Sequence, residues 1–342
     1  HGHRVTLFSE RYTGAAREEV IDGVSIIRKG RWWSVHLYAM FYYLIRLRNT
    51  VDIIIDEVHW YPFFSILYAR HKTVLLVCEV ADKLFFRLLP YPFALFARFV
   101  EKIYIFLYRS SPVLAISEST KASLLGEGFD PACVTVIPMG LSLPKIVRRY
   151  PKASTLTLIV VARLQKFKGI ADAIAAFARI QMSIPSANLW IVGGDSEGYQ
   201  KDLERIAKNL GVYPHVKFFG RVQEEKKFEL LARAHILLMP SIHEGWGLVV
   251  PEAASQGTPD IGYRTAGVQE VIVDGKTGVL VEAGKSEILA EETLNLWKDQ
   301  RRYHRYQEAG IKRALSMNWE DTARVALNVI QRSYEKRKIS HD

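Results

Sequence analysis

Short apolar runs rich in β-branched residues recur along this chain, and segments with helical periodicity lie between them. The helical patterns are clearest at 169–182, 198–210 and 224–233. Strands that alternate with helices form parallel sheets with helices on both faces. We therefore expect an α/β protein made of doubly wound units. The expected strands are 4–8, 52–56, 73–78, 112–116, 134–137, 156–161, 188–192, 216–219, 235–239 and 278–281.

The alternation breaks at residues 139–155, where proline, glycine and charged residues gather. Such a stretch is typical of an interdomain linker, and a chain of 342 residues is long enough for two domains. We expect domains at 1–145 and 146–320 and a helical segment at 321–342. The chain opens on a turn and a strand, so the strand, glycine-rich turn and helix that normally begin a doubly wound domain are expected to be missing.

Composition narrows the class of protein. The net charge is +10, but the excess of lysine and arginine is spread over both halves, which argues against a nucleic-acid-binding arm. No apolar run reaches the roughly 18 residues of a membrane span, and no secretory signal is evident. Two cysteines cannot form a disulfide framework and lack metal-ligand spacing. We expect a cytoplasmic protein.

Two stretches combine many aromatic residues with scattered cations, at 31–48 and 84–109. A helix at a membrane interface buries such a face in lipid and holds its cations at the headgroups. The alternative is a core helix with a few cations that reach solvent. Peripheral contact with an anionic membrane, at its cytosolic face, is therefore one of two interpretations.

The strongest chemical signal is the segment HEGWGLVVPE, which follows a predicted strand. Gly245 and Gly247 allow the backbone to approach a ligand closely, and a helix is expected to start near Val249. Amides at a helix start suit a phosphate. Glu244 in the loop and Glu252 in the first turn would then accept hydrogen bonds from neutral hydroxyls. A phosphate between hydroxyl-bearing rings describes a nucleotide-sugar.

A second signal is VARLQKFKG at 161–169, directly after a predicted strand. Arg163 and Lys168 lie five residues apart across a tight turn into a helix. Two cations there could neutralise a diphosphate and stabilise it as a leaving group. A solvated basic turn is the alternative, and the position of this turn at the end of the domain's first strand favours the site.

Together these segments resemble glycosyltransferase family 4, the retaining nucleotide-sugar transferases of the GT-B fold, also described as glycosyl transferases group 1. Four stretches carry the resemblance in order: SPVLAISESTKASLLGEGFDPACVTVIPMGLSL, VARLQKFKGIADAIAAF, VGGDSEGYQKDLERIAKNLGVYPHVKFFGRV and PSIHEGWGLVVPEAASQGTP. The resemblance implies two facing Rossmann-like domains with a cleft between them. It also implies a hexosyltransferase that uses a UDP-sugar or GDP-sugar, needs no other cofactor, and acts on a glycan or lipid-linked acceptor.

The resemblance also implies roles for particular residues. Arg163 and Lys168 would hold the donor diphosphate, and Glu244 would bind hydroxyls of the donor sugar, so these three are the expected catalytic residues. Glu252 would hold the ribose hydroxyls. The remaining donor-binding positions are Trp246, Gly247, Leu248 and Val249 through their backbone amides, Val222 near the base, and Gly193.

The chain departs from the family pattern in several places. The glycine-rich loop after the first strand is absent, and Cys78 stands where many members have a histidine. A thiol cannot reproduce the hydrogen bonding of imidazole to a sugar hydroxyl. Glu79, Asp82 and His59 are the other polar candidates in this half. Asp260 lies where an apolar residue would continue a buried strand, so it needs a partner or partial exposure.

These departures leave alternatives open. The chain could be a catalytically impaired or non-catalytic nucleotide-sugar-binding relative, or a sugar-nucleotide epimerase. The sequence has no Asp-x-Asp motif in a suitable loop, so we expect metal-independent transfer, with protein cations in the role that a metal has elsewhere.

Overall fold

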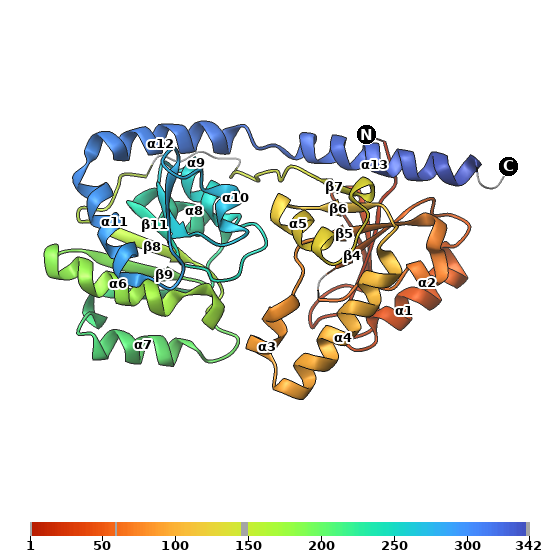
Figure 1. The fold of residues 1–342 in the computed structure, drawn as a ribbon, viewed down its shortest axis with the longest axis horizontal. Coiled ribbons are helices and arrows are strands. Elements are labelled where there is room, and N and C mark those ends of the chain that lie inside the picture. Colours follow the sequence, from red (N-terminus) through yellow and green to blue (C-terminus); the bar gives the residue numbers. More distant parts are fainter. Residues whose placement is uncertain (1, 59, 145–149, 340–342) are drawn as a thin grey trace. The chain divides into compact units, whose positions relative to one another are not determined.

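The computed structural model describes residues 2–58, 60–144 and 150–339. The chain divides into two compact units. The first takes in residues up to Ala115, Thr120–Val136 and the chain from Ala326 onward, and the second holds Ile116–Ser119 and Ile137–Val325. Both units are α/β (Figure 1). The boundaries at 145 and 320 stay predictions.

The first unit contains two sheets. A three-stranded sheet has the order β1-β3-β2, and a four-stranded parallel sheet has the order β4-β5-β6-β7. The strands are β1 Thr6–Ser9, β2 Glu18–Ile21, β3 Val24–Arg28, β4 Ile54–Val58, β5 Thr73–Val77, β6 Val113–Ala115 and β7 Val134–Val136. The helices are α1 Val35–Tyr42, continued by a π-helical turn at Tyr43–Leu47, then α2 Ile66–Ala69, α3 Phe85–Leu88, α4 Tyr91–Tyr108 and α5 Glu118–Gly126.

An antiparallel hairpin of β2 and β3 lies near the start of the chain, where no strand was predicted. Its two-residue turn is Asp22–Gly23, and both residues have positive φ, at 49° and 81°. Asp-Gly is the preferred pair for this turn, because both of its central residues need positive φ. The Asp-Gly turn is visible in the sequence, but the polarity of the flanking strands is too mixed to predict strands there.

Helix α4 has two apolar faces. One face packs into the core of the first unit through Ala97, Tyr104 and Tyr108, spaced as one side of a helix. The other face is exposed and carries Phe93, Phe96, Phe99 and Phe106. The helix at 91–108 therefore contributes to the core, as one interpretation of 84–109 expected, while contact of its exposed aromatic face with a membrane stays a prediction.

The second unit is a six-stranded, fully parallel sheet with the order β10-β9-β8-β11-β12-β13. Buried side chains form clusters on both faces of this sheet, as a doubly wound unit requires. The strands are β8 Thr157–Val161, β9 Asn188–Val192, β10 Val216–Gly220, β11 Ile236–Met239, β12 Asp260–Tyr263 and β13 Gly278–Val281. The helices are α6 Ile170–Ser183, α7 Gln200–Asn209, α8 Glu224–Arg233, α9 Val249–Ser255, α10 Val268–Val271, α11 Ser286–Lys298 and α12 Gln300–Leu315. The last helix, α13 Trp319–Ile339, begins in this unit and belongs to the first unit from Ala326 onward.

The linker prediction falls on residues 139–155, of which 145–149 lie outside the described residues. The described parts, 139–144 and 150–155, contain no helix or strand. Lys152 attaches the later part to the second unit, because its ammonium donates to the carbonyl oxygens of Ala234 and Gly257 at 2.6 and 3.0 Å. No helix among the described residues combines the length and hydropathy that crossing a membrane requires.

Asp260 contradicts the expectation that it would have a partner or partial exposure. The side chain is 0% exposed at the start of β12. Neither carboxyl oxygen has a hydrogen-bond partner among the described residues. Burial therefore raises the pKa of this carboxyl well above its ordinary value.

Candidate active site

The strand order of the second unit defines one preferred place for a ligand. From the middle of the sheet, β8, β9 and β10 follow one another toward one edge, and β11, β12 and β13 follow one another toward the opposite edge. The strand order therefore reverses between β8 and β11. In open α/β sheets a ligand binds outside the carboxyl ends of the strands at this reversal point. The loop after β8 carries Arg163 and Lys168, and the loop after β11 carries Glu244.

These two loops touch through their backbones. The N–H of Ile242 donates to the carbonyl oxygen of Phe167 at 2.9 Å. Gly169 has φ +66°, and a Cβ there would lie 1.9 Å from the carbonyl oxygen of Pro240. Only glycine fits such an approach without displacing a loop, and this glycine is the N-cap of α6, directly after Lys168.

The loop after β9 joins the same edge through Gly193. A Cβ at Gly193 would lie 1.8 Å from the carbonyl oxygen of Ala162. The amide of Leu164 donates to the carbonyl oxygen of Gly194 at 3.0 Å, which ties the β8 and β9 loops together. Gly193 thus has a structural reason to lack a side chain, and it lies at the edge where its predicted role would place it.

Lys168 and Glu244 form an ion pair at this carboxyl edge of the sheet, although they lie 76 residues apart in the sequence. The ammonium donates to Oε2 of Glu244 at 2.7 Å, and the side chains are only 13% and 17% exposed. Lys168 also lies 5.3 Å from the ring centroid of Phe167. Arg163 is exposed on the same loop. The predicted catalytic residues are therefore at one edge, with the lysine and the glutamate already paired.

Glu252 lies on α9 and has a partner that the sequence did not reveal. The ammonium of Lys227, on α8, donates to Oε1 of Glu252 at 2.9 Å and pairs with Glu224 at 2.8 Å. Burial raises the pKa of Glu252, against the lowering effect of the Lys227 hydrogen bond. Burial acts to lower the pKa of Lys227, but its hydrogen bonds to the two glutamates outweigh this and raise it.

Local sequence could not have identified Lys227. Its neighbour Lys226 has the same charge, but it pairs with Glu229 one turn along α8 and stays 45% exposed. Only the packing of α8 against α9 turns Lys227 toward Glu252.

The other predicted donor-binding positions divide into backbone and side-chain cases. Trp246 and Val249 are buried in the core, so they can offer a ligand only their backbone. Gly247 has φ +91°, a conformation that glycine adopts without strain. Leu248 is exposed. Val222 follows β10 and packs, half-buried, against the same core.

In the first unit, Cys78 follows β5, and burial raises the pKa of its thiol to about 11. Thr120 donates its hydroxyl to the carbonyl oxygen of Cys78 at 3.1 Å. Glu79 and Asp82 lie in the same loop. The candidate His59 lies outside the described residues. Within the described ranges no group of three or more histidine, cysteine or acidic residues could hold a metal ion.

Solved structures show the same fold over nearly the whole chain. Sucrose-phosphate synthase from Thermosynechococcus elongatus matches with a TM-score of 0.76 at 18% identity, over 99% of this chain and 90% of that one. WaaG, a glycosyltransferase of lipopolysaccharide biosynthesis, matches with a TM-score of 0.70 at 16% identity, over 95% and 91%. Anabaena HepE, solved with UDP and glucose, matches with a TM-score of 0.70 at 17% identity, over 96% and 99%. The fold is that of the GT-B glycosyltransferases.

Sequence comparison identifies the family. The model described as Glycosyltransferase Family 4 matches residues 1–144, and the model described as Glycosyl transferases group 1 matches 145–313. The chain belongs to this family of group 1, family 4-like glycosyltransferases. It is 30% identical to a glycogen synthase of Mycobacterium tuberculosis over 239 residues, which cover 68% of this chain. That alignment spans 57% of the relative's length.

Proposed function

We propose that this chain moves a hexose from a nucleoside-diphosphate sugar to a glycan or lipid-linked acceptor, with retention of anomeric configuration. The observation that carries the proposal is the convergence of Lys168 and Glu244 at the reversal point of the parallel sheet, 2.7 Å apart. Family membership supports the reaction class. The solved relative that holds UDP and glucose supports a UDP-sugar donor, and a GDP-sugar is the alternative.

The paired side chains suggest how the residues share the work. Arg163 and Lys168 would neutralise the two charges of the leaving diphosphate. Glu244, which pairs with Lys168, would then accept hydrogen bonds from sugar hydroxyls. The bond from C1 of the sugar to phosphate oxygen breaks while the acceptor oxygen attacks the same face. The acceptor proton passes to the departing phosphate oxygen, so neither a metal nor a covalent nucleophile is needed.

The first experiment measures UDP and GDP binding by calorimetry. Glu252→Ala should weaken binding of the preferred nucleotide about tenfold or more, because ribose hydroxyls lose their acceptor. Glu224→Ala is the matched control, because Glu224 also pairs with Lys227 but its side chain is 77% exposed. Binding of neither nucleotide by the unaltered chain would refute the proposal.

The second experiment separates the two glutamates. Glu244→Gln should leave UDP affinity equal to or above that of the unaltered chain, because it frees Lys168 for the diphosphate. Release of UDP from the UDP-sugar should nevertheless fall at least about tenfold, which corresponds to 1.4 kcal/mol of lost transition-state stabilisation. Equal losses of UDP affinity in Glu244→Gln and Glu252→Ala would contradict these separate roles. Activity that persists in EDTA would support metal independence.

Cys78 favours a second candidate function, a donor-binding relative with impaired transfer. Its thiol is half-buried, and the raised pKa keeps it protonated. A protonated thiol is a poor hydrogen-bond partner for a sugar hydroxyl. Transfer by Cys78→His, with none by the unaltered chain, would establish this alternative. Chromatography of the products would show a changed sugar-nucleotide if the chain were an epimerase.

We further propose peripheral contact with the cytosolic face of an anionic membrane. The exposed face of α4 carries Phe96 and Phe99, and the net charge of the chain is +10. Aromatic side chains beside cations suit the interface of anionic lipids. Sedimentation with phosphatidylglycerol vesicles should fall several-fold in Phe96→Ser/Phe99→Ser. Met182→Ser, at a residue that is 85% exposed in the second unit, should have no effect.

A further inference from the structure

Two neighbouring loops of the first unit contain strained backbone. They follow β4 and β5, which pair in parallel with Val58 opposite Val77, so both loops lie at the carboxyl edge of one sheet. Trp60, Phe64 and Asp82 in these loops have positive φ, at 76°, 54° and 40°. Residues other than glycine adopt such conformations at a cost, and such residues cluster at functional sites.

A buried carboxylate holds the loop after β4. Asp56 is 1% exposed and accepts the backbone N–H groups of Phe63 and Ser65 at 2.6 and 2.9 Å. The hydroxyls of Ser65 and Tyr108 also donate to Asp56, each at 2.6 Å. Four donors on one carboxylate compensate its burial and fix the course of the loop.

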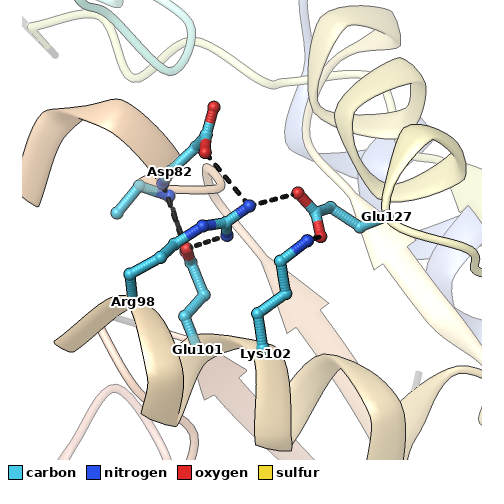
Figure 2. Close-up of polar contacts among 6 residues, drawn as sticks. Asp82, Arg98, Glu101, Lys102 and Glu127 are labelled. Carbon is cyan, nitrogen blue, oxygen red and sulfur yellow. Dashed lines mark hydrogen bonds and ion pairs between the residues drawn. The ribbon is translucent and has the colours of Figure 1, made fainter. Parts of the chain in front are cut away.

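A second buried carboxylate holds the loop after β5. Glu101, on α4, is 0% exposed and accepts the N–H of Ala81 at 3.0 Å and the N–H of Asp82 at 3.2 and 3.3 Å. Figure 2 shows the guanidinium of Arg98 between Glu101 and Glu127, with a third contact to the Asp82 carboxylate at 3.0 Å. The loop is therefore held through both the backbone and the side chain of Asp82.

Glu101 is a costly residue at its position. It shares the buried face of α4 with alanine and tyrosine side chains, where an apolar residue would fit. Burial raises the pKa of Glu101 although Arg98 and the loop amides act to lower it. A buried ion pair adds little stability compared with an apolar replacement. What the carboxylate supplies here is a fixed geometry for two backbone amides of the loop.

The two loops also support each other. The ring of Phe85, which is fully buried, lies 5.5 Å from the ring of Trp60 and 6.2 Å from that of Tyr61. Trp60 remains 42% exposed, and the Asp82 side chain is 47% exposed. An exposed aromatic face and an accessible carboxylate suit a ligand with many hydroxyls, because the ring takes its C–H face and the carboxylate accepts its hydroxyl protons.

We propose that Glu101, held by Arg98, is a positioning residue that sets the loop Cys78–Leu84 to receive the hydroxyl-bearing acceptor. The acceptor role of this loop rests on the proposed transferase function. Glu101 itself touches no substrate. It acts through the loop, which carries the exposed Asp82 side chain and leads into Phe85, whose ring packs against that of Trp60.

Cys78 provides a reporter at the start of this loop. It is half-buried, and its raised thiol pKa keeps the reactive thiolate scarce. The chain contains one other cysteine, Cys133, so Cys133→Ser leaves a single thiol. In that background we would measure labelling by an aromatic disulfide reagent at pH 8 for three further variants: Glu101→Ala, Glu101→Gln and Glu127→Ala. The last is the matched control, because Glu127 pairs with Arg98 but contacts no loop amide in the network of Figure 2.

Glu101→Ala should label at least tenfold faster than the parent, Glu101→Gln should lie between them because it keeps one acceptor oxygen, and Glu127→Ala should stay within twofold. Glucose, mannose, N-acetylglucosamine and myo-inositol are the acceptor probes. At least one should slow labelling of the parent and lose that effect in Glu101→Ala. Equal labelling of the Glu101→Ala and Glu127→Ala variants would overturn the positioning role. Failure of every probe to slow the parent would overturn the acceptor role.

Calorimetry with UDP keeps the two proposals distinguishable. The affinity for UDP should not change in Glu101→Ala, because its loop belongs to the first unit and the candidate donor site belongs to the second. Absence of UDP binding in the parent would refute the proposed function, while the labelling contrast would still decide whether Glu101 positions the loop.

Discussion

Replacing Asp260 by valine should make this protein more stable, and increasingly so as pH rises. Asp260 begins β12, lies opposite Leu237 on one neighbouring strand and Gly278 on the other, and is fully buried. Its carboxyl oxygens have no partner within the described residues. Valine has a similar volume and suits a buried parallel strand.

The expected gain in the free energy of unfolding has two parts, one independent of pH and one that depends on it. A neutral carboxyl buried without a hydrogen bond costs about 1 to 3 kcal/mol, so the variant should gain that much even near pH 4. The folded-state pKa is raised above the unfolded value of about 3.9. Between these values the folded chain holds a proton that the unfolded chain releases, so the free energy of unfolding falls as pH rises, by about 1.4 kcal/mol per unit. The gap between variant and parent should therefore widen with pH until the folded pKa is passed.

Urea unfolding from pH 4 to pH 8, followed by tryptophan fluorescence and circular dichroism, measures this gap. Asp260→Asn is the control, because an amide keeps the polar side chain but cannot ionise. It should therefore lack the pH-dependent part and retain the constant cost. A gap between the valine variant and the parent that stays constant over this range would refute the reasoning, as would a valine variant less stable than the parent at every pH.

Three further outcomes follow from other contacts. Gly169→Ala should cost at least about 2 kcal/mol of stability in urea unfolding, because its Cβ would meet the carbonyl oxygen of Pro240, whereas Gly211→Ala, with similar φ but open space, should cost about 1 kcal/mol. Asp56→Asn should destabilise the chain by about 3 kcal/mol in the same assay, since an amide has a single acceptor oxygen and cannot accept all four donors. Burial lowers the pKa of His235 to about 4 from an ordinary value of 6.5. Between these values the unfolded chain binds a proton that the folded chain does not, so the free energy of unfolding should fall by about 2 to 3 kcal/mol from pH 6.5 to pH 4. In His235→Asn this pH-dependent loss should be absent.

Much of the fold follows from local pattern. The strands of the second unit match the predicted runs within a residue or so, because each is a short apolar run bounded by turn residues. The exception is β12, where Asp260 interrupts the run. In the first unit the strands and helices at 73–77 and 91–108 follow the same logic. The hairpin at 18–28 did not, because its strands have too little apolar periodicity to stand out.

By itself the sequence predicted the residues of a donor site, each from its distance to a strand end or a helix start: Arg163, Lys168, Glu244 and Glu252. Local periodicity suffices for that, because it fixes where strands end. The tertiary structure alone decided the partners. Lys168 meets Glu244 across 76 residues, Lys227 meets Glu252 across 25, and Glu101 reaches the amide of Ala81 across 20. Such pairs depend on how helices pack on the sheet and on which side chains lose water, and no local pattern encodes either.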